Sequence, residues 1–336
     1  MYIVSSYSRF ADVARPAVWS LPRALSRLQP DACALLVAVN ERVWQVGDPG
    51  LLELVRVRVA QLIGNPAALR VRSPYADVTV VPEAKLLALP GYPGSPLFSA
   101  AERDTLAFTE QFLMDVGGTD ATARAGLVEH FGADGARALV SAIYVVEFTQ
   151  RLQLIAARVL DDDAWSPALV SPPPVGDASP ADLLKEYQAA VMRGNTLDPM
   201  TTELIRLRCA RTHRCRICQT LRLADARAAG VDEEITAQID FYERSDLPDR
   251  AKVALRVTDA FIIRPDLLSD TVAEQARMSF EPAELASLCL GITKWSTQKI
   301  HVALGTDGAD GLETDDDGVA LLSFDETGRP TGYRRR

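Results

Sequence analysis

The strongest constraint on the fold of this chain is an internal repeat with a period near 150 residues. Three short segments recur with matching residue types: 53–60 with 203–210, 109–113 with 258–262, and 149–152 with 297–300. The offset drifts only from 150 to 148 residues between the first match and the last. Chance similarity does not keep its register in this way, and the period is too long for a solenoid unit. The sequence therefore predicts two tandem copies of one domain.

The predicted domain boundaries follow from where the repeat begins and ends. A Pro-rich linker at 169–180 joins a first domain at 20–168 to a second domain at 181–305. Several prolines in succession make such a connection semi-rigid. Residues 306–336 lie outside the repeat and include an acidic loop.

Both copies show hydrophobic spacing that is typical of helices. Apolar residues recur every three or four positions in 181–192, 249–263 and 282–298. Strand-like alternation is confined to 319–324 and 331–333, which flank a Gly-containing turn and predict a short β-hairpin. The predicted fold class is therefore all-α, with two tandem helical domains and a C-terminal hairpin.

Composition limits the partners and the compartment. The chain has 45 acidic and 36 basic residues, a net charge of −9, whereas nucleic-acid binding needs a cationic face. No apolar run approaches the ~18 residues of a transmembrane helix, and the first residues lack a signal-peptide pattern. We therefore expect a cytoplasmic protein without nucleic-acid or membrane partners. In that reducing compartment a close cysteine pair indicates redox or metal chemistry rather than a structural disulfide.

Cys215 and Cys218 form such a close pair. Local patterns predict a helix over 203–211, a tight turn at 212–214 and a second helix over 216–229. The equivalent turn of the first copy reads Gly-Asn-Pro, which is a typical helix start. Cys215 is therefore predicted at the N-cap of the second helix and Cys218 at its third position.

This placement favours a reactive thiolate. A thiol in the first turn of a helix faces free N–H groups and the positive end of the helix dipole. Arg211, Arg214 and Arg216 add positive charge to the same turn. We predict that Cys218 is the attacking sulfur and that Cys215 resolves the product as a disulfide.

The helical hairpin also predicts which side chains meet. It places Glu203 level with Arg222, and Arg222 follows Cys218 by four residues, one helical turn. These three residues are expected to cluster. Glu53 and Arg72 keep the same spacing in the first copy, which has no thiols there. A Glu203–Arg222 ion pair with a structural role is therefore predicted beside a catalytic role for Glu203.

The stretch 203–230 resembles the carboxymuconolactone decarboxylase superfamily, and in particular its alkyl hydroperoxidase D-like branch. That branch has a Glu twelve residues before a CxxC motif, and Glu203 and Cys215 have this separation. The resemblance covers 181–304 well and 30–160 weakly. It implies an all-helical fold, assembly into trimers or hexamers, and thiol peroxidase or disulfide reductase chemistry.

The resemblance also implies residue roles. Cys218 would attack a peroxide, Cys215 would resolve it, and Glu203 would be the relay carboxylate. The family His that follows the second Cys by four residues is Arg222 here. A guanidinium stays protonated and cannot shuttle a proton, although it can hold an anion. His213, two residues before Cys215, is a candidate replacement for the missing imidazole.

The resemblance implies that the helix carrying Lys294 and Trp295 helps to line the pocket, and that no metal or organic cofactor is needed. The alternative is a zinc site formed by Cys209, His213, Cys215 and Cys218. Core packing explains Cys209 better, because the equivalent residue of the first copy is Val59.

The remaining cysteines and histidines have no motif around them. Cys33 and Cys289 lie in apolar runs and are expected to be buried as small hydrophobic residues. His130 and His301 are expected at the surface or in an interface.

The sequence thus predicts a thiol-dependent oxidoreductase that cycles Cys215 and Cys218 between dithiol and disulfide. Its partners would be a small peroxide or disulfide substrate and a dithiol reductant, and we expect a homo-oligomer, a dimer or a trimer. Two alternatives stay open. One is a cofactor-free decarboxylase or isomerase in which Arg222 clamps a carboxylate, and the other is a non-catalytic interaction protein.

Overall fold

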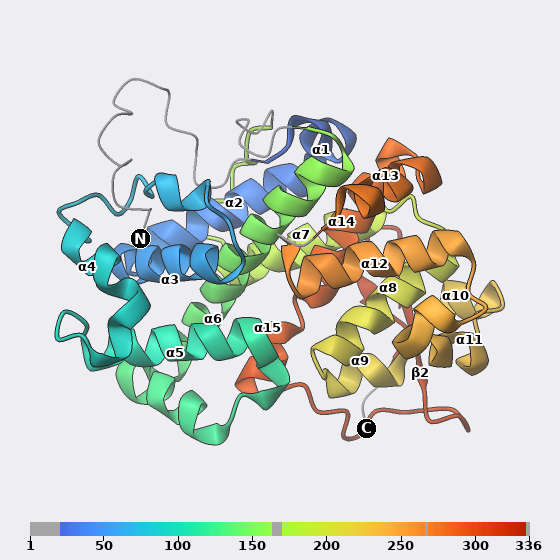
Figure 1. The fold of residues 1–336 in the computed structure, drawn as a ribbon. Helices are drawn as coiled ribbons and strands as arrows, with labels where there is room; N and C mark the ends of the chain where they lie inside the picture. The colour runs from blue at the N-terminus through green and yellow to red at the C-terminus, as the bar shows by residue number, and fades with distance from the viewer. Residues whose placement is uncertain (1–20, 163–169, 266–267, 334–336) are drawn as a thin grey trace.

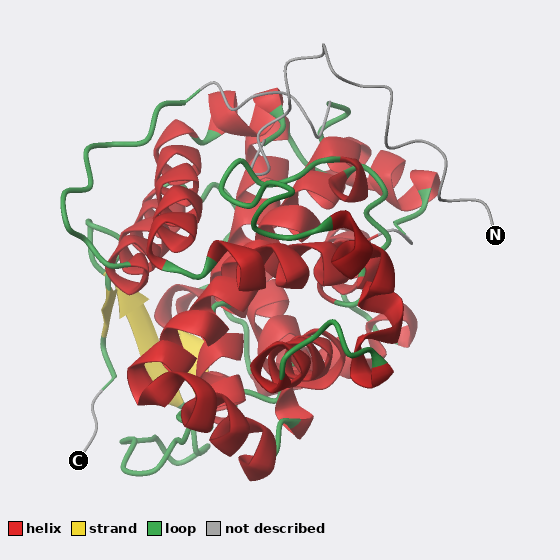
Figure 2. Cartoon of the chain, turned by 90° about the vertical axis from the view of Figure 1, so that its left-hand side faces the viewer, coloured by secondary structure: helices red, strands yellow, loops and turns green. Residues whose placement is uncertain are grey.

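Helices dominate the structure, as the sequence predicts. The computed structural model describes residues 21–162, 170–265 and 268–333, and among these residues the strands form one small sheet near the C-terminus (Figures 1 and 2). The all-α fold class with a short C-terminal β element is therefore confirmed. The predicted linker begins at residue 169, outside the described residues, and its remainder is loop up to the next helix.

The first half of the chain, residues 21–162, holds the following elements: α1 (Arg23–Leu28), α2 (Pro30–Val46), α3 (Pro49–Leu62), η1 (Ala68–Arg70), α4 (Glu83–Ala88), η2 (Leu89–Gly94), α5 (Ala100–Asp115), η3 (Val116–Gly118) and α6 (Ala121–Val159).

The second half, residues 170–333, holds these elements: α7 (Pro180–Arg193), α8 (Pro199–Thr212), α9 (Arg216–Thr220), β1 (Leu221–Leu223), α10 (Ala224–Ala228), α11 (Glu233–Ala237), η4 (Gln238–Arg244), α12 (Asp249–Ile262), α13 (Asp270–Ser279), α14 (Pro282–Ser296), α15 (Lys299–Leu304), β2 (Ala320–Phe324) and β3 (Pro330–Thr331).

Local capping chemistry sets where many of these helices begin. Ser179 and Asp198 accept a backbone N–H at the starts of α7 and α8, and each helix has proline in its first turn. The helices predicted from 181 and from 249 are confirmed as α7 and α12. The helix predicted over 282–298 ends at Ser296, and α15 follows it as a separate helix.

Helix α6 runs through the middle of the molecule (Figure 1). It is 39 residues long, with a kink at Gly132, whose φ of +70° suits glycine. It packs against α3 and α5 of its own half and against α14 and α15 of the other half. Its length and hydropathy would suffice to cross a membrane, but 83% of its most apolar window is buried within the protein. It is therefore buried in the way of a core helix.

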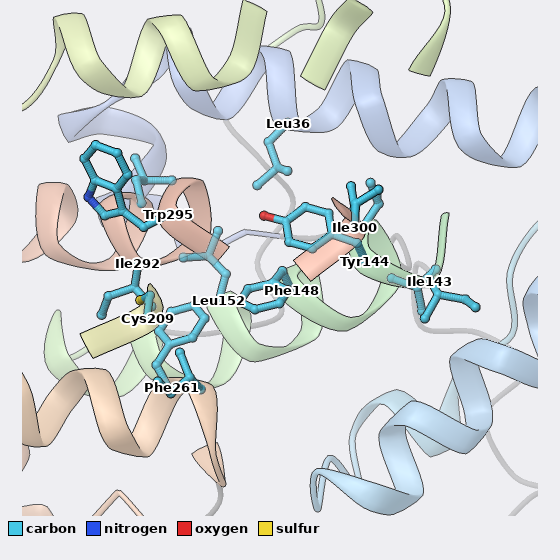
Figure 3. Close-up of a cluster of buried hydrophobic side chains, with 14 of the residues drawn as sticks. Leu36, Ile143, Tyr144, Phe148, Leu152, Cys209, Phe261, Ile292, Trp295 and Ile300 are labelled. Atoms are coloured by element: carbon cyan, nitrogen blue, oxygen red, sulfur yellow. The ribbon is translucent and has the colours of Figure 1, made fainter. Parts of the chain in front are cut away.

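The hydrophobic core draws on both halves of the chain. Helix α2 packs along α7, and α6 packs against α14. Figure 3 shows Leu36 of α2, Phe148 of α6, Phe261 of α12 and Ile292 of α14 in one buried cluster. The two halves therefore share buried surface rather than meeting only at the linker.

The small sheet ties the C-terminal segment to the segment that follows the CxxC motif. Strand β1 pairs with β2 in parallel, with Leu221 opposite Ala320, and β2 pairs with β3 antiparallel. The predicted hairpin is confirmed as β2 and β3. The helix predicted over 216–229 is wrong, because residues 221–223 are extended and pair with a strand about one hundred residues further along the chain.

Candidate functional site

The CxxC segment begins a short helix after a tight turn. Arg214 takes a left-handed conformation, with φ +54°, between α8 and α9. Cys215 is the N-cap of α9, and its Sγ accepts the backbone N–H of Cys218 at 3.3 Å. The predicted N-cap and third-residue positions are confirmed. The two cysteines are joined by a disulfide bond.

The two sulfur-bearing residues differ in access. Cys218 is 9% exposed and lines a pocket of about 330 Å³, whereas Cys215 is fully buried and does not line it. This volume lies at the small end of the range for ligand sites. A molecule from solution therefore meets Cys218 first, with Cys215 behind it.

The walls of the pocket are mostly apolar and come from several distant segments, among them α7, α8, α14 and the C-terminal hairpin. Ile217 lies within the cysteine motif and Leu221 follows it, Trp295 comes from α14, and Leu322 and Phe324 come from β2. The sequence interpretation missed the contribution of residues 306–333, because they lie outside the repeat. The tertiary pairing of β2 with β1 brings them to the cysteines.

The C-terminal hairpin and α7 lie against each other and together line part of the pocket. Arg329 forms an ion pair with Glu186 at 2.6 Å, and Arg193 donates a hydrogen bond to the carbonyl oxygen of Thr327 at 2.8 Å. Gly328 lies so close to α7 that a Cβ there would be 2.1 Å from the carbonyl oxygen of Ala189. The hairpin is therefore packed closely against α7.

A buried ion pair holds the cysteine segment in place through hydrogen bonds to its backbone. Glu203 and Arg206 are both almost fully buried and bond through two N–H···O contacts of 2.6 and 2.8 Å. Arg206 also donates to the carbonyl oxygens of Cys218 at 2.8 Å and Leu221 at 2.5 Å. All three nitrogens of this guanidinium are thus bonded within the protein, and Glu203 acts on the cysteines through Arg206.

The predicted Glu203–Arg222 ion pair is wrong. Arg222 bonds instead to Glu233, at 2.9 and 2.6 Å, and donates to the carbonyl oxygens of Gln219 and Leu221. Its hydrogen bond to Glu233 holds the pKa of that carboxyl group below its usual value. The reason is the break at residues 221–223, which removes Arg222 from the helical face of Cys218. Arg222 does not line the pocket.

His213 also lies away from the pocket. It is the C-cap of α8, buried, with Nε2 at 3.1 Å from Oγ of Ser296. Burial, together with the charges of Lys299 and Arg151, holds its pKa well below the ordinary value. His213 is therefore a neutral core residue, and its ring is not among the groups that line the Cys218 pocket.

The three arginines expected to activate the thiol are each paired with a carboxylate. The pairs are Arg211 with Asp240 at 3.0 Å, Arg214 with Asp115 at 3.0 Å, and Arg216 with Asp307 at 2.9 Å. Asp307 also accepts the backbone N–H of Arg216. These partners offset much of the positive charge that the sequence places in this turn.

The same framework of bonds occurs in the first half at an offset of 150 residues. Glu53 pairs with Arg56, which donates to the carbonyl oxygens of Ala68 and Val71. Arg72 pairs with Glu83 in the way that Arg222 pairs with Glu233. Asn65 Oδ1 accepts the N–H of Ala68, as Cys215 Sγ accepts that of Cys218. Because this half lacks thiols at these positions, both ion pairs serve the framework.

Lys294 is the site residue that sequence reasoning did not single out for chemistry. Its ammonium lies 3.0 Å from the ring centroid of Trp295 and 4.4 Å from that of Phe324, and the side chain lines the pocket. The residue is only 6% exposed. Burial, and secondarily the charge of Arg206, holds its pKa well below the ordinary value. The sequence does carry one indication of this residue, which is a lysine within an otherwise apolar helix.

The remaining cysteines are packing residues. Cys33, Cys209 and Cys289 are free and buried, and burial raises the pKa of each thiol to about 12. The expectation that Cys33 and Cys289 are buried is confirmed. Within the described residues no group of three or more His, Cys, Asp or Glu side chains is placed to hold a metal ion. His130 and His301 lie at the surface.

Comparison with known proteins identifies a family domain that contains the cysteine segment. Residues 180–258 match the model of the carboxymuconolactone decarboxylase family. Two uncharacterized proteins of Mycobacterium tuberculosis, from strains CDC 1551 / Oshkosh and H37Rv, are each 36% identical to this chain over 232 residues. Each match covers 67% of this chain and 81% of the relative. No solved structure matches the chain. Residues 180–258 of the chain thus form a domain of the carboxymuconolactone decarboxylase family.

Proposed function

We propose that this protein is a thiol-dependent oxidoreductase that reduces a hydroperoxide or exchanges a disulfide through Cys215 and Cys218. The proposal rests on one observation, which is that the two cysteines of the disulfide differ in their access to the pocket. Cys218 lines the pocket, and Cys215 is bonded to it from the buried side. This is the arrangement that an attacking sulfur and a resolving sulfur require.

The peroxidase cycle has three balanced steps. The Cys218 thiolate attacks one oxygen of a hydroperoxide, which gives a Cys218 sulfenic acid and releases an alcohol after protonation. The thiol of Cys215 attacks the Cys218 sulfur, and the disulfide forms with loss of water. A dithiol reductant then attacks Cys218, the accessible sulfur, and its second thiol releases the reduced pair as the reductant becomes a disulfide.

We further propose that the chain belongs to the alkyl hydroperoxidase D-like branch and arose by tandem duplication. The CxxC motif at the start of α9 supports the first point. The bonds repeated at an offset of 150 residues, Glu53–Arg56 with Glu203–Arg206, support the second. A cytoplasmic location, a dithiol partner and assembly into a dimer or trimer belong to the same proposal.

The decarboxylase or isomerase alternative is not proposed. It requires Arg222 to clamp a carboxylate, but this guanidinium is bonded to Glu233 and does not line the pocket.

Mass spectrometry and turnover assays test the proposal. Reduced wild-type protein, treated with cumene hydroperoxide, is expected to lose two hydrogens as the Cys215–Cys218 disulfide forms. Cys218→Ser is expected to lose hydroperoxide consumption with dihydrolipoamide. Cys215→Ser is expected to accumulate a Cys218 sulfenic acid, which dimedone traps, and to turn over poorly. Cys33→Ala removes a buried thiol remote from the pocket and should leave turnover unchanged.

Two results together would overturn the proposal. One is that hydroperoxide leaves the reduced pair untouched. The other is that the Cys215–Cys218 disulfide does not exchange with dihydrolipoamide, so that neither half of the cycle operates.

A further inference from the structure

Lys294 stands apart from the other lysines of the chain. The sequence contains five lysines. Four of them bond to oxygen acceptors within the protein: Lys85 to Glu102, Lys185 to Asp182, Lys252 to the carbonyl oxygen of Ser245, and Lys299 to Glu147. Within the described part of the chain, Lys294 forms no ion pair with a carboxylate, and its contacts are aromatic rings.

Lys299 provides a matched comparison inside the same core. It is as deeply buried as Lys294, but both oxygens of Glu147 accept from its ammonium, at 3.0 and 2.8 Å. Lys299 does not line the pocket, whereas Lys294 does. The buried lysine outside the pocket, Lys299, thus has a carboxylate partner. Lys294 has none and lines the pocket.

None of the charged groups described around Lys294 offers its ammonium a carboxylate partner. From α8, Arg206 is cationic and its carboxylate partner Glu203 is fully engaged by it. Glu186, which also lines the pocket, pairs with Arg329. On α6, Glu147 is held by Lys299 and Arg151.

The other titratable groups near α14 are also engaged elsewhere or neutral. Tyr144 of α6 donates its hydroxyl to the carbonyl oxygen of Thr293. Arg250 of α12 pairs with Glu284 at the far end of α14, and Tyr333 lines the pocket. Burial beside a second cation favours the neutral amine, which is the reactive form of lysine, although the faces of Trp295 and Phe324 attract the ammonium.

We propose that Lys294 is a nucleophilic amine that forms an imine with a small apolar aldehyde or ketone bound in the Cys218 pocket. The amine nitrogen attacks the carbonyl carbon to give a carbinolamine, which loses water as the carbon–nitrogen double bond forms. Addition of water reverses the reaction, so no oxidant, reductant or cofactor is required. The reaction is one of the established uses of a desolvated lysine.

The pocket suits such a ligand. Its apolar walls, with Trp295 and Phe324 on one side and Ile217, Leu221 and Leu322 on others, favour a hydrocarbon body. The side chains of Gln188 and Gln298 also line it and can bond to a carbonyl oxygen. The inference goes beyond the proposed thiol chemistry and does not depend on it, because imine formation needs no free thiol.

Reductive trapping on the oxidised, full-length protein tests the proposal. The disulfide form is incubated with hexanal and cyanoborohydride at neutral pH, and the alkylated residues are mapped by peptide mass spectrometry. Keeping the disulfide prevents hexanal from adding to Cys218. Only the five lysines and the terminal amine can react in this way, so peptide mapping can assign each adduct to one residue. We expect Lys294 to be alkylated first, although it is far less exposed than Lys185.

Two variants bracket the result. Lys294→Met should abolish the fast adduct, while Lys85→Met, which changes a lysine outside the pocket, should leave it unchanged. If Lys294→Met fails to fold, the wild-type peptide map still decides the question, because it shows which lysine is alkylated first. Alkylation that follows surface exposure, with Lys185 and Lys85 modified and Lys294 spared, would overturn the proposal. Failure of the peroxide assay would leave this outcome untouched, so the two proposals are distinguished.

Discussion

At the residue scale, Arg206 is the residue that organises the cysteine segment. It joins a buried carboxylate to two backbone carbonyl oxygens, those of Cys218 and Leu221. The signal for this role was present in the sequence, because Glu203 and Arg206 are three residues apart on a helix and Glu53 and Arg56 repeat the spacing. Arg222 drew attention instead, because it replaces the histidine of the family that the motif resembles.

Arg206→Met is therefore expected to destabilise the protein strongly, because it leaves Glu203 as a buried charge without a partner. Removing one member of a buried pair costs roughly 3–5 kcal/mol. Arg329→Met, which removes an exposed pair with Glu186, should cost no more than about 1 kcal/mol. Urea unfolding followed by circular dichroism measures both. Equal and small losses for the two variants would contradict the role assigned to Arg206.

At the element scale, the C-terminal hairpin completes the pocket. Its strand β2 pairs with β1 directly after the short helix that carries the cysteines, and its turn rests on α7. A segment outside the repeat therefore forms part of the pocket wall that Cys218 also lines. The strand pairing and the close approach at Gly328 fix its position.

Gly328→Ala is expected to lift the hairpin and to open the pocket. The new Cβ would clash with the backbone of Ala189, which cannot give way as a side chain can, and the φ of +79° adds strain. Alkylation of Cys218 by iodoacetamide, measured after reduction, should become faster than in wild type.

Gly318→Ala is the matched control for the hairpin. It has a similar φ of +75°, but nothing lies within 4 Å of its added Cβ. It should share the backbone strain, roughly 1 kcal/mol, without changing the alkylation rate. Equal alkylation rates in both variants and wild type would show that the hairpin does not limit access to Cys218.

At the scale of the whole molecule, a buried charge cluster links the two halves. Lys299 of α15 and Arg151 of α6 both bond to Glu147 of α6. Arg151 also donates to the carbonyl oxygen of Phe261 on α12. The contacts of α2 with α7 and of α6 with α14 add apolar surface between the same halves. We expect the halves to unfold together as one cooperative unit.

This cluster predicts a pH dependence of stability. Burial lowers the pKa of Lys299 from 10.5 to about 8 in the folded protein. Between these values the unfolded chain binds more protons than the folded chain, so the free energy of unfolding rises with pH there. The gain from Lys299 is up to about 3 kcal/mol across that interval and is absent below it.

Lys299→Met isolates the effect of this residue. Denaturant unfolding at several pH values between about 7.5 and 10.5 should show the wild type gaining stability relative to the variant. Glu147 keeps Arg151 as its partner in the variant. Parallel pH profiles for the two proteins would rule out the assigned titration.

The sequence by itself determined the elements whose causes are local. The helical spacing of 181–192 and 249–263, the capping position of Cys215 and the C-terminal hairpin all depend on residues within a few positions of one another. Short-range hydrogen bonds and side-chain periodicity act within such windows, so the pattern of residues suffices to predict them. The predicted helical hairpin also placed Glu203 near Cys218, and Arg206 bonds to both residues.

Only the tertiary structure decided the partners of the charged side chains and the shape of the pocket. Arg222 bonds to Glu233 rather than to Glu203 because residues 221–223 are extended and not helical. Lys294 lies in a cavity without a carboxylate partner, because α14, α8 and the hairpin meet around it and Glu186 is paired with Arg329. Burial and long-range pairing arise from segments far apart in the chain, and these set the charge state and access of a group. No local pattern encodes them.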